Sequence, residues 1–243
     1  MSRNVIKIVI FFVVGMIGGI FADQIFWPYF IEKPLFHQYR LEQNPVYVTE
    51  IKETMIQENT ALTIAIEKVD TSITGVRTKT STGEMLEGSG LIITSDGLMV
   101  TLASLVPLDS EYSFFIDGKK YSYQILKRDF VNDLALVKLG KTNLPVINFA
   151  NLDEISLGER VFVLGITFEE LEKEIISTGF SANEGIIKKL DKDIISTNII
   201  ENKIMLGSSL FNIKGEIIGL AVVNNRGEIN VISVTQIKEF VGL

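Results

Sequence analysis

The sequence contains no cysteine and a single histidine, His37. Without cysteine the chain cannot form disulfides, use a thiolate in catalysis or bind a metal through sulfur. One histidine and scattered carboxylates show no metal-ligand spacing, and the glycine-rich motif GMIGG follows no strand. We therefore expect no metal and no cofactor. A lone surface histidine usually has no special role, and we interpret His37 in this way.

The sequence also lacks an excess of basic residues. The net charge is −7, and neither acidic nor basic residues form long blocks. Because nucleic-acid binding needs a basic patch or stripe, we expect no nucleic-acid partner. With 47% hydrophobic residues among 243, the composition is that of a globular protein able to bury one sizeable core or two small ones.

Residues 8–21 form an apolar run, IVIFFVVGMIGGIF, without a charged side chain. Counted from Val5, and so with Lys7 included, the segment has 17 residues. As a helix it would be about 25 Å long, at the short end for spanning a hydrocarbon core. Arg3 and Lys7 precede it, and the aromatic segment FWPYF follows it. We therefore predict a transmembrane helix in residues 1–31, with a cytoplasmic N-terminus and the rest of the chain outside the cytoplasm.

A cleaved signal peptide is the alternative for this segment. The only small residue near its end is Ala22, and Ile20 stands two positions earlier, where a cleavage site has a small residue. The sequence favours an uncleaved membrane anchor, and cleavage stays open as the second interpretation.

Residues 32–59 are predicted to form a juxtamembrane stalk. Pro34 and Pro45 interrupt helix formation, and the stretch QNPVYVTEIKETMIQENT alternates apolar and polar residues without a turn signal. Asn59 or Thr60 can cap a helix that runs through ALTIAIEKV. We expect this helix to close one end of the domain that follows.

After residue 70 the pattern changes to short runs rich in β-forming residues. Examples are ITGVRTKT, GSGLIIT, LALVKL, RVFVLGI and EIIGLAVV, separated by turns that contain Gly, Asp-Gly or Asn. Strands at this spacing predict an all-β sandwich or a pair of barrels.

Four segments carry a resemblance to a known family: EGSGLIITSDGLMVTLASLVP, NDLALVKL, GERVFVLGI and ISTNIIENKIMLGSSLFNIKGEIIGL. In order and spacing they are similar to trypsin-like serine proteases of the HtrA type, over roughly residues 62–243. The resemblance implies two six-stranded β-barrels with the site in the cleft between them, and we assign this domain to residues 60–243. It also implies a homo-oligomer, commonly a trimer. Because the sequence ends at Leu243, we expect no C-terminal peptide-binding PDZ domain.

The resemblance also shows what the site has lost. Serine-protease chemistry needs a hydroxyl nucleophile, an imidazole base, a carboxylate that orients the imidazole, and backbone donors for the oxyanion. The family's histidine position is occupied by Ser104, and no histidine occurs in residues 38–243. Asp133 stands at the position of the orienting carboxylate. It can bond to the Ser104 hydroxyl or to backbone amides without a catalytic role.

The nucleophile segment departs further from the family pattern. Leu206 stands at the position of the reactive serine, and leucine cannot attack a carbonyl. Ile204 stands where the family has a glycine whose backbone amide lines the oxyanion hole. A β-branched residue disfavours positive φ and would crowd a substrate at this point.

An active serine endopeptidase with a non-standard nucleophile is the alternative. Ser208 or Ser209 would then attack, in envelope protein quality control. Serine–lysine dyads work without histidine, and Lys203 and Lys214 flank these serines in sequence. Such a dyad needs a desolvated lysine aimed at the hydroxyl, which residues so close in sequence seldom provide.

The sequence thus predicts a membrane-anchored, extracytoplasmic homologue of the trypsin-like proteases that is catalytically inactive and binds peptides or protein partners. An extended peptide can add as a strand to a sheet edge without any nucleophile. The resemblance places Thr197, Asn198 and Asn202 in segments that line the specificity pocket, so they are candidates for peptide contact. A purely structural role in a membrane complex also stays open.

Overall fold

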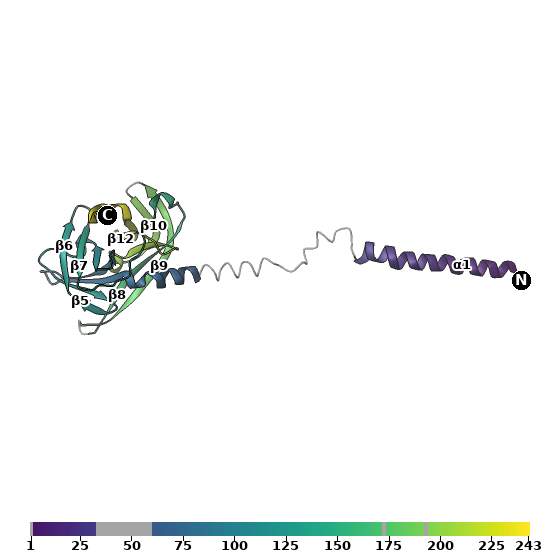
Figure 1. Ribbon diagram of the computed structural model, residues 1–243, viewed down its shortest axis with the longest axis horizontal. Helices are drawn as coiled ribbons and strands as arrows, with labels where there is room; N and C mark the ends of the chain where they lie inside the picture. Colours follow the sequence, from purple (N-terminus) through teal and green to yellow (C-terminus); the bar gives the residue numbers. More distant parts are fainter. Residues whose placement is uncertain (1, 33–59, 172–173, 192–193) are drawn as a thin grey trace. The chain divides into compact units, whose positions relative to one another are not determined.

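The computed structural model describes residues 2–32, 60–171, 174–191 and 194–243 (Figure 1). The chain divides into two units, Met1–Met55 and Ile56–Leu243. The predicted stalk, apart from Glu32, and the single histidine, His37, lie outside the described residues.

The first unit is helical in its described part. Helix α1 (Ser2–Phe21) continues into a wider π-helical stretch, η1 (Ala22–Glu32). Among the described residues, one segment, Arg3–Trp27, is a helix long and apolar enough to cross a membrane, and none of it is buried. A secretory signal sequence near the N-terminus can meet the same criteria of length and composition, so this helix is compatible with either an anchor or a signal.

The second unit begins with the expected helix, which is described over residues 60–69. Val69 is buried, and Leu62 and Ile66 are half-buried on the same face. The Lys68 ammonium donates to the backbone oxygen of Lys214, 2.9 Å away. This helix therefore packs on the turn of a hairpin far along the chain.

The first half of this unit is one antiparallel sheet of seven strands in the order β5-β4-β1-β2-β3-β7-β6. The strands are β1 (Ile73–Lys79), β2 (Met85–Ile92), β3 (Leu98–Thr101), β4 (Glu111–Ile116), β5 (Lys119–Tyr121), β6 (Tyr123–Asp129) and β7 (Leu134–Leu139). Only Ser122 separates the two edge strands, β5 and β6, in sequence. The sheet is therefore a half-barrel whose two edges are joined by one bent segment of chain, rather than a regular six-stranded barrel.

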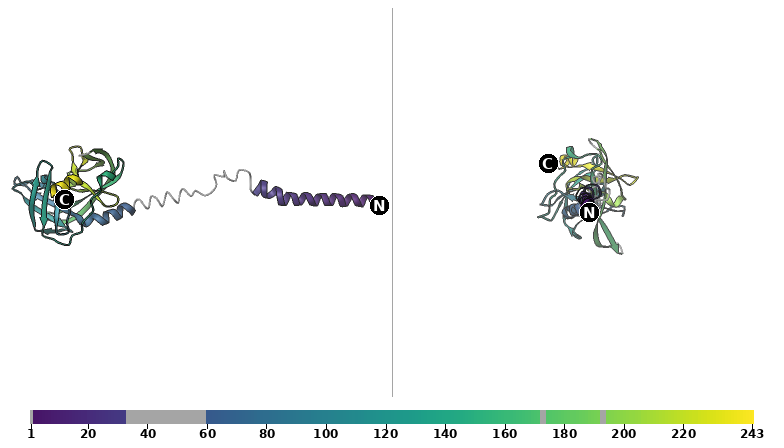
Figure 2. Two further views of the ribbon diagram at one scale, coloured as in Figure 1. Left: turned by 45° about the horizontal axis from the view of Figure 1, so that its top comes forward. Right: turned by 90° about the vertical axis from the view of Figure 1, so that its right-hand side faces the viewer.

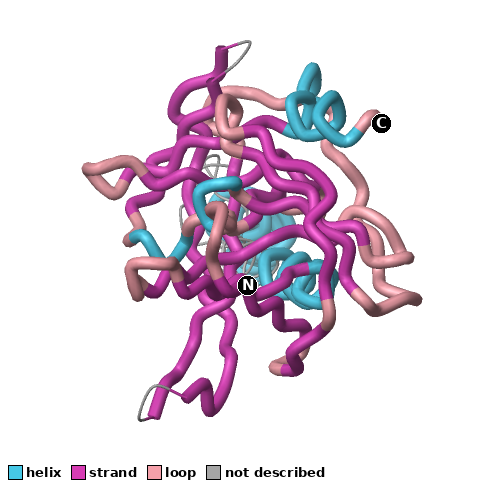
Figure 3. Tube along the Cα trace, turned by 90° about the vertical axis from the view of Figure 1, so that its left-hand side faces the viewer, coloured by secondary structure: helices cyan, strands magenta, loops and turns pink. Residues whose placement is uncertain are grey.

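The second half is a closed six-stranded barrel in the order β10-β13-β12-β11-β8-β9. Its strands are β8 (Arg160–Leu171), β9 (Glu174–Asp191), β10 (Ile194–Ile200), β11 (Ser209–Asn212), β12 (Ile217–Val223) and β13 (Glu228–Ser233). The strands of the β8–β9 and β9–β10 hairpins extend beyond the body of the domain (Figure 3). The trypsin-like all-β fold expected from the sequence is confirmed.

A repeated turn explains why these strands form hairpins. In Asn-Ile-Lys-Gly-Glu, the Asn212 side chain accepts from the backbone N–H groups of Lys214 and Glu216, both at 3.0 Å. The segment Asn-Asn-Arg-Gly-Glu repeats this geometry from Asn224. The glycine of each turn has positive φ, 75° at Gly215 and 81° at Gly227. Three-residue hairpin loops with glycine in the left-handed region have this form.

Short helices and a C-terminal helix complete the unit. The short helices are η3 (Asp70–Ser72), η4 (Ala103–Leu105), η5 (Leu152–Glu154) and η6 (Lys203–Met205). Helix α3 (Val234–Val241), drawn in yellow in Figure 2, begins with a capping box formed by Ser233 and Gln236. Its buried face packs on the larger of two apolar cores, and the smaller core fills the closed barrel.

Candidate functional site

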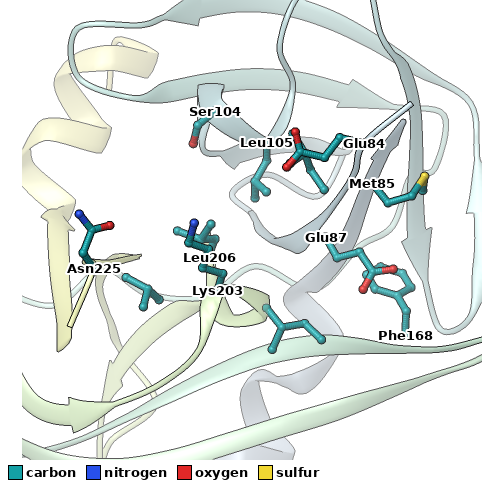
Figure 4. Close-up of a pocket in the computed structure, with 12 residues that line it drawn as sticks. Glu84, Met85, Glu87, Ser104, Leu105, Phe168, Lys203, Leu206 and Asn225 are labelled. Atoms are coloured by element: carbon teal, nitrogen blue, oxygen red, sulfur yellow. The ribbon is translucent and has the colours of Figure 1, made fainter. Parts of the chain in front are cut away.

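A cleft of about 850 Å³ lies between the half-barrel and the closed barrel (Figure 4). Strand β2 and helix η4 form one wall, and helix η6 with the end of β12 forms the other. Its lining residues are Glu84, Met85, Leu86, Glu87, Ser104, Leu105, Phe168, Lys203, Ile204, Leu206, Val223 and Asn225. Three of the positions singled out from the sequence, Ser104, Ile204 and Leu206, therefore share one cavity.

Ser104 and Asp133 form a closed local pair at the cleft. One Asp133 oxygen accepts from the Ser104 backbone N–H at 2.6 Å, and the other accepts from the Ser104 hydroxyl at 2.9 Å. Asp133 has φ of 52°, a left-handed conformation that aspartate tolerates better than most residues. The carboxylate thus holds helix η4 in place, and Ser104 stays exposed with its hydroxyl already donated.

The backbone amides around Leu206 all donate within the protein. The Ile204 N–H donates to the Asn202 side chain at 3.0 Å, and the Leu206 N–H donates to the Lys203 oxygen at 3.1 Å. The Gly207 N–H donates to the Ala221 oxygen at 2.9 Å. An oxyanion hole needs donors that point at the reacting oxygen. In this loop the amide of Ile204, where the resemblance implies an oxyanion donor, is already engaged, and so is the amide of Leu206.

Leu206 is fixed between the two halves of the domain. Its side chain is half-buried and packs against both apolar cores. Its backbone oxygen accepts from the Ser89 N–H on β2 at 2.9 Å. A Cβ on Gly88 would collide with this oxygen, and a Cβ on Gly207 would collide with the Ser89 oxygen. The EGSG motif therefore contains a glycine that lets β2 and the η6 loop approach each other closely.

The two serines of the alternative mechanism lie inside the protein. Ser208 and Ser209 both have 0% of their surface exposed. The Ser208 hydroxyl lies 3.8 Å from the Met205 sulfur, and the Ser209 hydroxyl has no hydrogen-bond partner among the described residues. Neither serine lines the cleft that holds Lys203. In this conformation neither hydroxyl can reach a substrate.

The three candidates for peptide contact do not line the cleft. Thr197 is 1% exposed, and its hydroxyl accepts from the Ile199 N–H at 3.2 Å. Asn198 accepts from the Ile186 N–H at 2.7 Å, so it ties β10 to β9. Asn202 caps helix η6. The structure gives each of these side chains a local hydrogen-bonding role and brings none of them to the cavity with Ser104.

The cleft also contains charged residues that the sequence analysis missed or used differently. Glu84 and Glu87 lie on one side, and Lys203 and Asn225 lie on the other (Figure 4). Burial raises the pKa of the Glu87 carboxyl above its usual value, and the Arg77 guanidinium, 3.4 Å away, partly opposes this effect. The sequence of strand β2 and of the turn before it gives no sign that Glu87 and Glu84 face this cavity, because only the packing of the two halves creates the cavity.

Within the described ranges no group of three or more His, Cys, Asp or Glu side chains could hold a metal ion. The cleft itself presents two glutamates, one of them paired with Arg77. Its surroundings contain apolar side chains and strand edges, which suit an extended polypeptide.

A family model described as a trypsin-like peptidase domain matches residues 88–220, more than half of the chain. The chain is 28% identical over 148 residues to a probable periplasmic serine endoprotease DegP-like of Chlamydia muridarum, covering 59% of this chain and 30% of the relative. It is 34% identical over 142 residues to serine protease HTRA1 of Xenopus laevis, covering 55% and 30%. The chain thus spans under a third of the length of these relatives.

Proposed function

The chain belongs to the trypsin-like peptidase domain family, in its HtrA type, and from this membership we propose that it is a catalytically inactive homologue that binds extended peptides in its cleft. The observation that carries the proposal is that Ser104 and Leu206, at the positions of base and nucleophile, face the same cavity. Neither side chain can perform the chemistry of its position. A hydroxyl is too weak a base to take up a proton at neutral pH, and the Ser104 hydroxyl already donates its own proton to Asp133. Leucine has no nucleophilic atom.

Strand β12 supports peptide binding by strand addition. The Ala221 N–H donates to the Ser208 oxygen at 2.7 Å, and the Ala221 oxygen accepts from Gly207. In an antiparallel strand every second residue directs its backbone polar groups to the same side. The backbone groups of Val223, which lines the cleft, therefore point to the side where the η6 loop ends and the cavity begins.

Strand β2 offers a second edge by the same reasoning. The Ser89 N–H leaves the sheet and donates to Leu206, so the backbone groups of Glu87 and Met85 point in the same direction. Both residues line the cleft. An extended peptide between the two edges could form backbone hydrogen bonds to either wall, and this mode needs no nucleophile.

The direct test uses the full chain in lipid nanodiscs with fluorescent extended peptides and with unfolded protein as a substrate. We expect saturable peptide binding, no hydrolysis and no labelling by serine-directed fluorophosphonates. Peptides methylated on alternate backbone nitrogens in two registers provide the matched control. Methylation in one of the two registers should abolish binding, because it removes the peptide N–H groups that donate to the strand edge. Labelling that disappears in Ser208→Ala or Ser209→Ala would contradict inactivity and favour the unconventional protease.

We also propose that α1 is an uncleaved anchor and that the domain lies outside the cytoplasm. Arg3 and Lys7 on the N-terminal side of the apolar segment support this orientation, and the DegP-like relatives carry the description periplasmic. Protease added to intact spheroplasts should digest the domain, and protection until lysis would reverse the orientation. Intact-mass measurement of the membrane-extracted protein should recover the N-terminal segment, whereas loss of about 22 residues would indicate a cleaved signal.

A further inference from the structure

The two sides of the cleft carry opposite charges. Lys203, on helix η6, lies on the same side as the amide of Asn225, and Glu84 and Glu87 lie across the cavity beside β2 (Figure 4). These four residues belong to two different halves of the domain, so the charge separation exists only where the half-barrel meets the closed barrel.

Among the described residues, two of these charges have no partner of opposite sign. In the part of the chain that the structure describes, no carboxylate forms an ion pair with the Lys203 ammonium, and no cation forms one with the Glu84 carboxylate. Glu87 differs, because Arg77 lies 3.4 Å away and both side chains are mostly buried. The cleft thus keeps one cation and one anion free on opposite sides.

We propose that these charges select the ligand, and this inference rests on the peptide binding proposed above. The cleft takes an extended segment that places a carboxylate at Lys203 and Asn225 and a basic side chain at Glu84. Charge complementarity of this kind discriminates between ligands by penalising like charges. The carboxylate can belong to an acidic side chain or to a free peptide C-terminus, since both present the same oxygens to an ammonium.

The test measures binding of four extended peptides of equal length and hydrophobicity to the full chain in zwitterionic nanodiscs. Two peptides carry one acidic and one basic residue in opposite orders, and two carry only acidic or only basic residues. We expect one mixed order to bind best, with each unfavourable charge weakening binding about fivefold at low salt. The preference should shrink as salt screens the charges. Amidated and free C-terminal versions identify the source of the carboxylate.

The decisive variant is the charge exchange Lys203→Glu with Glu84→Lys. It should transfer the preference to the mixed peptide of opposite order and leave the sum of charges unchanged. The matched control is Lys189→Glu with Glu67→Lys, which makes the same changes at exposed positions outside the cleft and should leave the preference as it is. Equal binding of all four peptides to the parent chain would overturn the inference while leaving peptide binding intact. Failure of every peptide to bind would instead contradict the proposed function, and the inference with it.

Discussion

The half-barrel side and the closed-barrel side of the proposed inactive centre differ in how much of the protease arrangement we expect each to have lost. On the half-barrel side, Asp133 keeps a carboxylate at the orienting position and bonds to Ser104, so the change is confined to one side chain. On the closed-barrel side, where we propose that Leu206 stands at the nucleophile position and Ile204 at the glycine position, the backbone amides of the loop donate within the protein.

This difference separates loss of a side chain from loss of a backbone arrangement. A missing imidazole can be restored by one substitution, because the carboxylate that would orient it is already in place. A missing oxyanion hole requires the loop to release hydrogen bonds that now satisfy its amides, and each such bond must be replaced or lost. The following predictions test whether the two sides really differ in this way.

The largest expected effect concerns repair of the centre. Ser104→His with Leu206→Ser restores the triad side chains around Asp133, but we expect this double variant to remain a poor enzyme. Ile204→Gly added to it should raise the rate of peptide hydrolysis roughly 100-fold or more, since one oxyanion donor contributes about 3 kcal/mol. Nucleophile, base and donors act as a unit, so the gain should exceed the effect of Ile204→Gly alone.

Ile204→Ala in the same double variant is the control, because alanine removes the branched side chain without permitting positive φ readily. Melting of each variant checks that the domain is folded. Full activity in the double variant with Ile204 intact would show that the alignment of the nucleophile loop is wrong and that the two sides do not differ in depth.

A smaller effect is expected where β2 meets the η6 loop. In Gly88→Ala the new methyl group would collide with the Leu206 backbone oxygen, which cannot move without breaking its bond to Ser89. We expect a loss of about 2–3 kcal/mol in the free energy of unfolding, measured by urea denaturation of the full chain in detergent. Gly179→Ala is the matched control, since its methyl group would meet only the Thr167 hydroxyl at 3.3 Å. Equal losses in both variants would show that the effect of Gly88→Ala does not come from the contact between β2 and the η6 loop.

Leu206→Ala tests whether the loop has gained a structural role. The side chain is half-buried against both cores, so its truncation should lower the free energy of unfolding by about 1–2 kcal/mol. Leu108→Ala, at a residue 61% exposed, should change it by less than about 0.5 kcal/mol. Indistinguishable unfolding curves for the two variants would argue against a stabilising role for Leu206.

The smallest effect concerns the turn before Asp133. Hydrogen bonds from the Asn132 side chain and backbone, followed by the Val131 backbone, hold the pKa of the Asp129 carboxyl below its usual value of 3.8. Because the folded pKa is lowered, this carboxylate stabilises the protein above about pH 4, and the contribution is lost as the pH falls through the folded pKa. Asp129→Asn should therefore lower the melting temperature at neutral pH. In acid, the difference in melting temperature between the variant and the parent chain should disappear. Asp109→Asn makes the same change at an exposed turn residue and controls for the loss of one carboxylate.

Much of the fold could be predicted from the sequence. Helix 60–69 follows from its apolar spacing, and the hairpins follow from glycine in repeated turn segments such as Asn-Ile-Lys-Gly-Glu. The resemblance that four segments carry also implies two β-barrels with a cleft between them. The join of β5 and β6 at Ser122 could not be predicted, because a strand that bends to close a sheet has the same residues as two separate strands.

The candidate site, like the fold, has features that the sequence predicts and features that only the tertiary structure decides. The sequence by itself determined which side chains are available: residues 38–243 contain no histidine, and the leucine at position 206 has no nucleophilic atom. Only the tertiary structure decided which polar groups are accessible. It buries Ser208, Ser209 and Thr197 and brings Glu84 to face Lys203 across one cavity. Side-chain chemistry is a property of each residue alone, whereas burial and opposition across a cleft arise from packing between segments more than 100 residues apart.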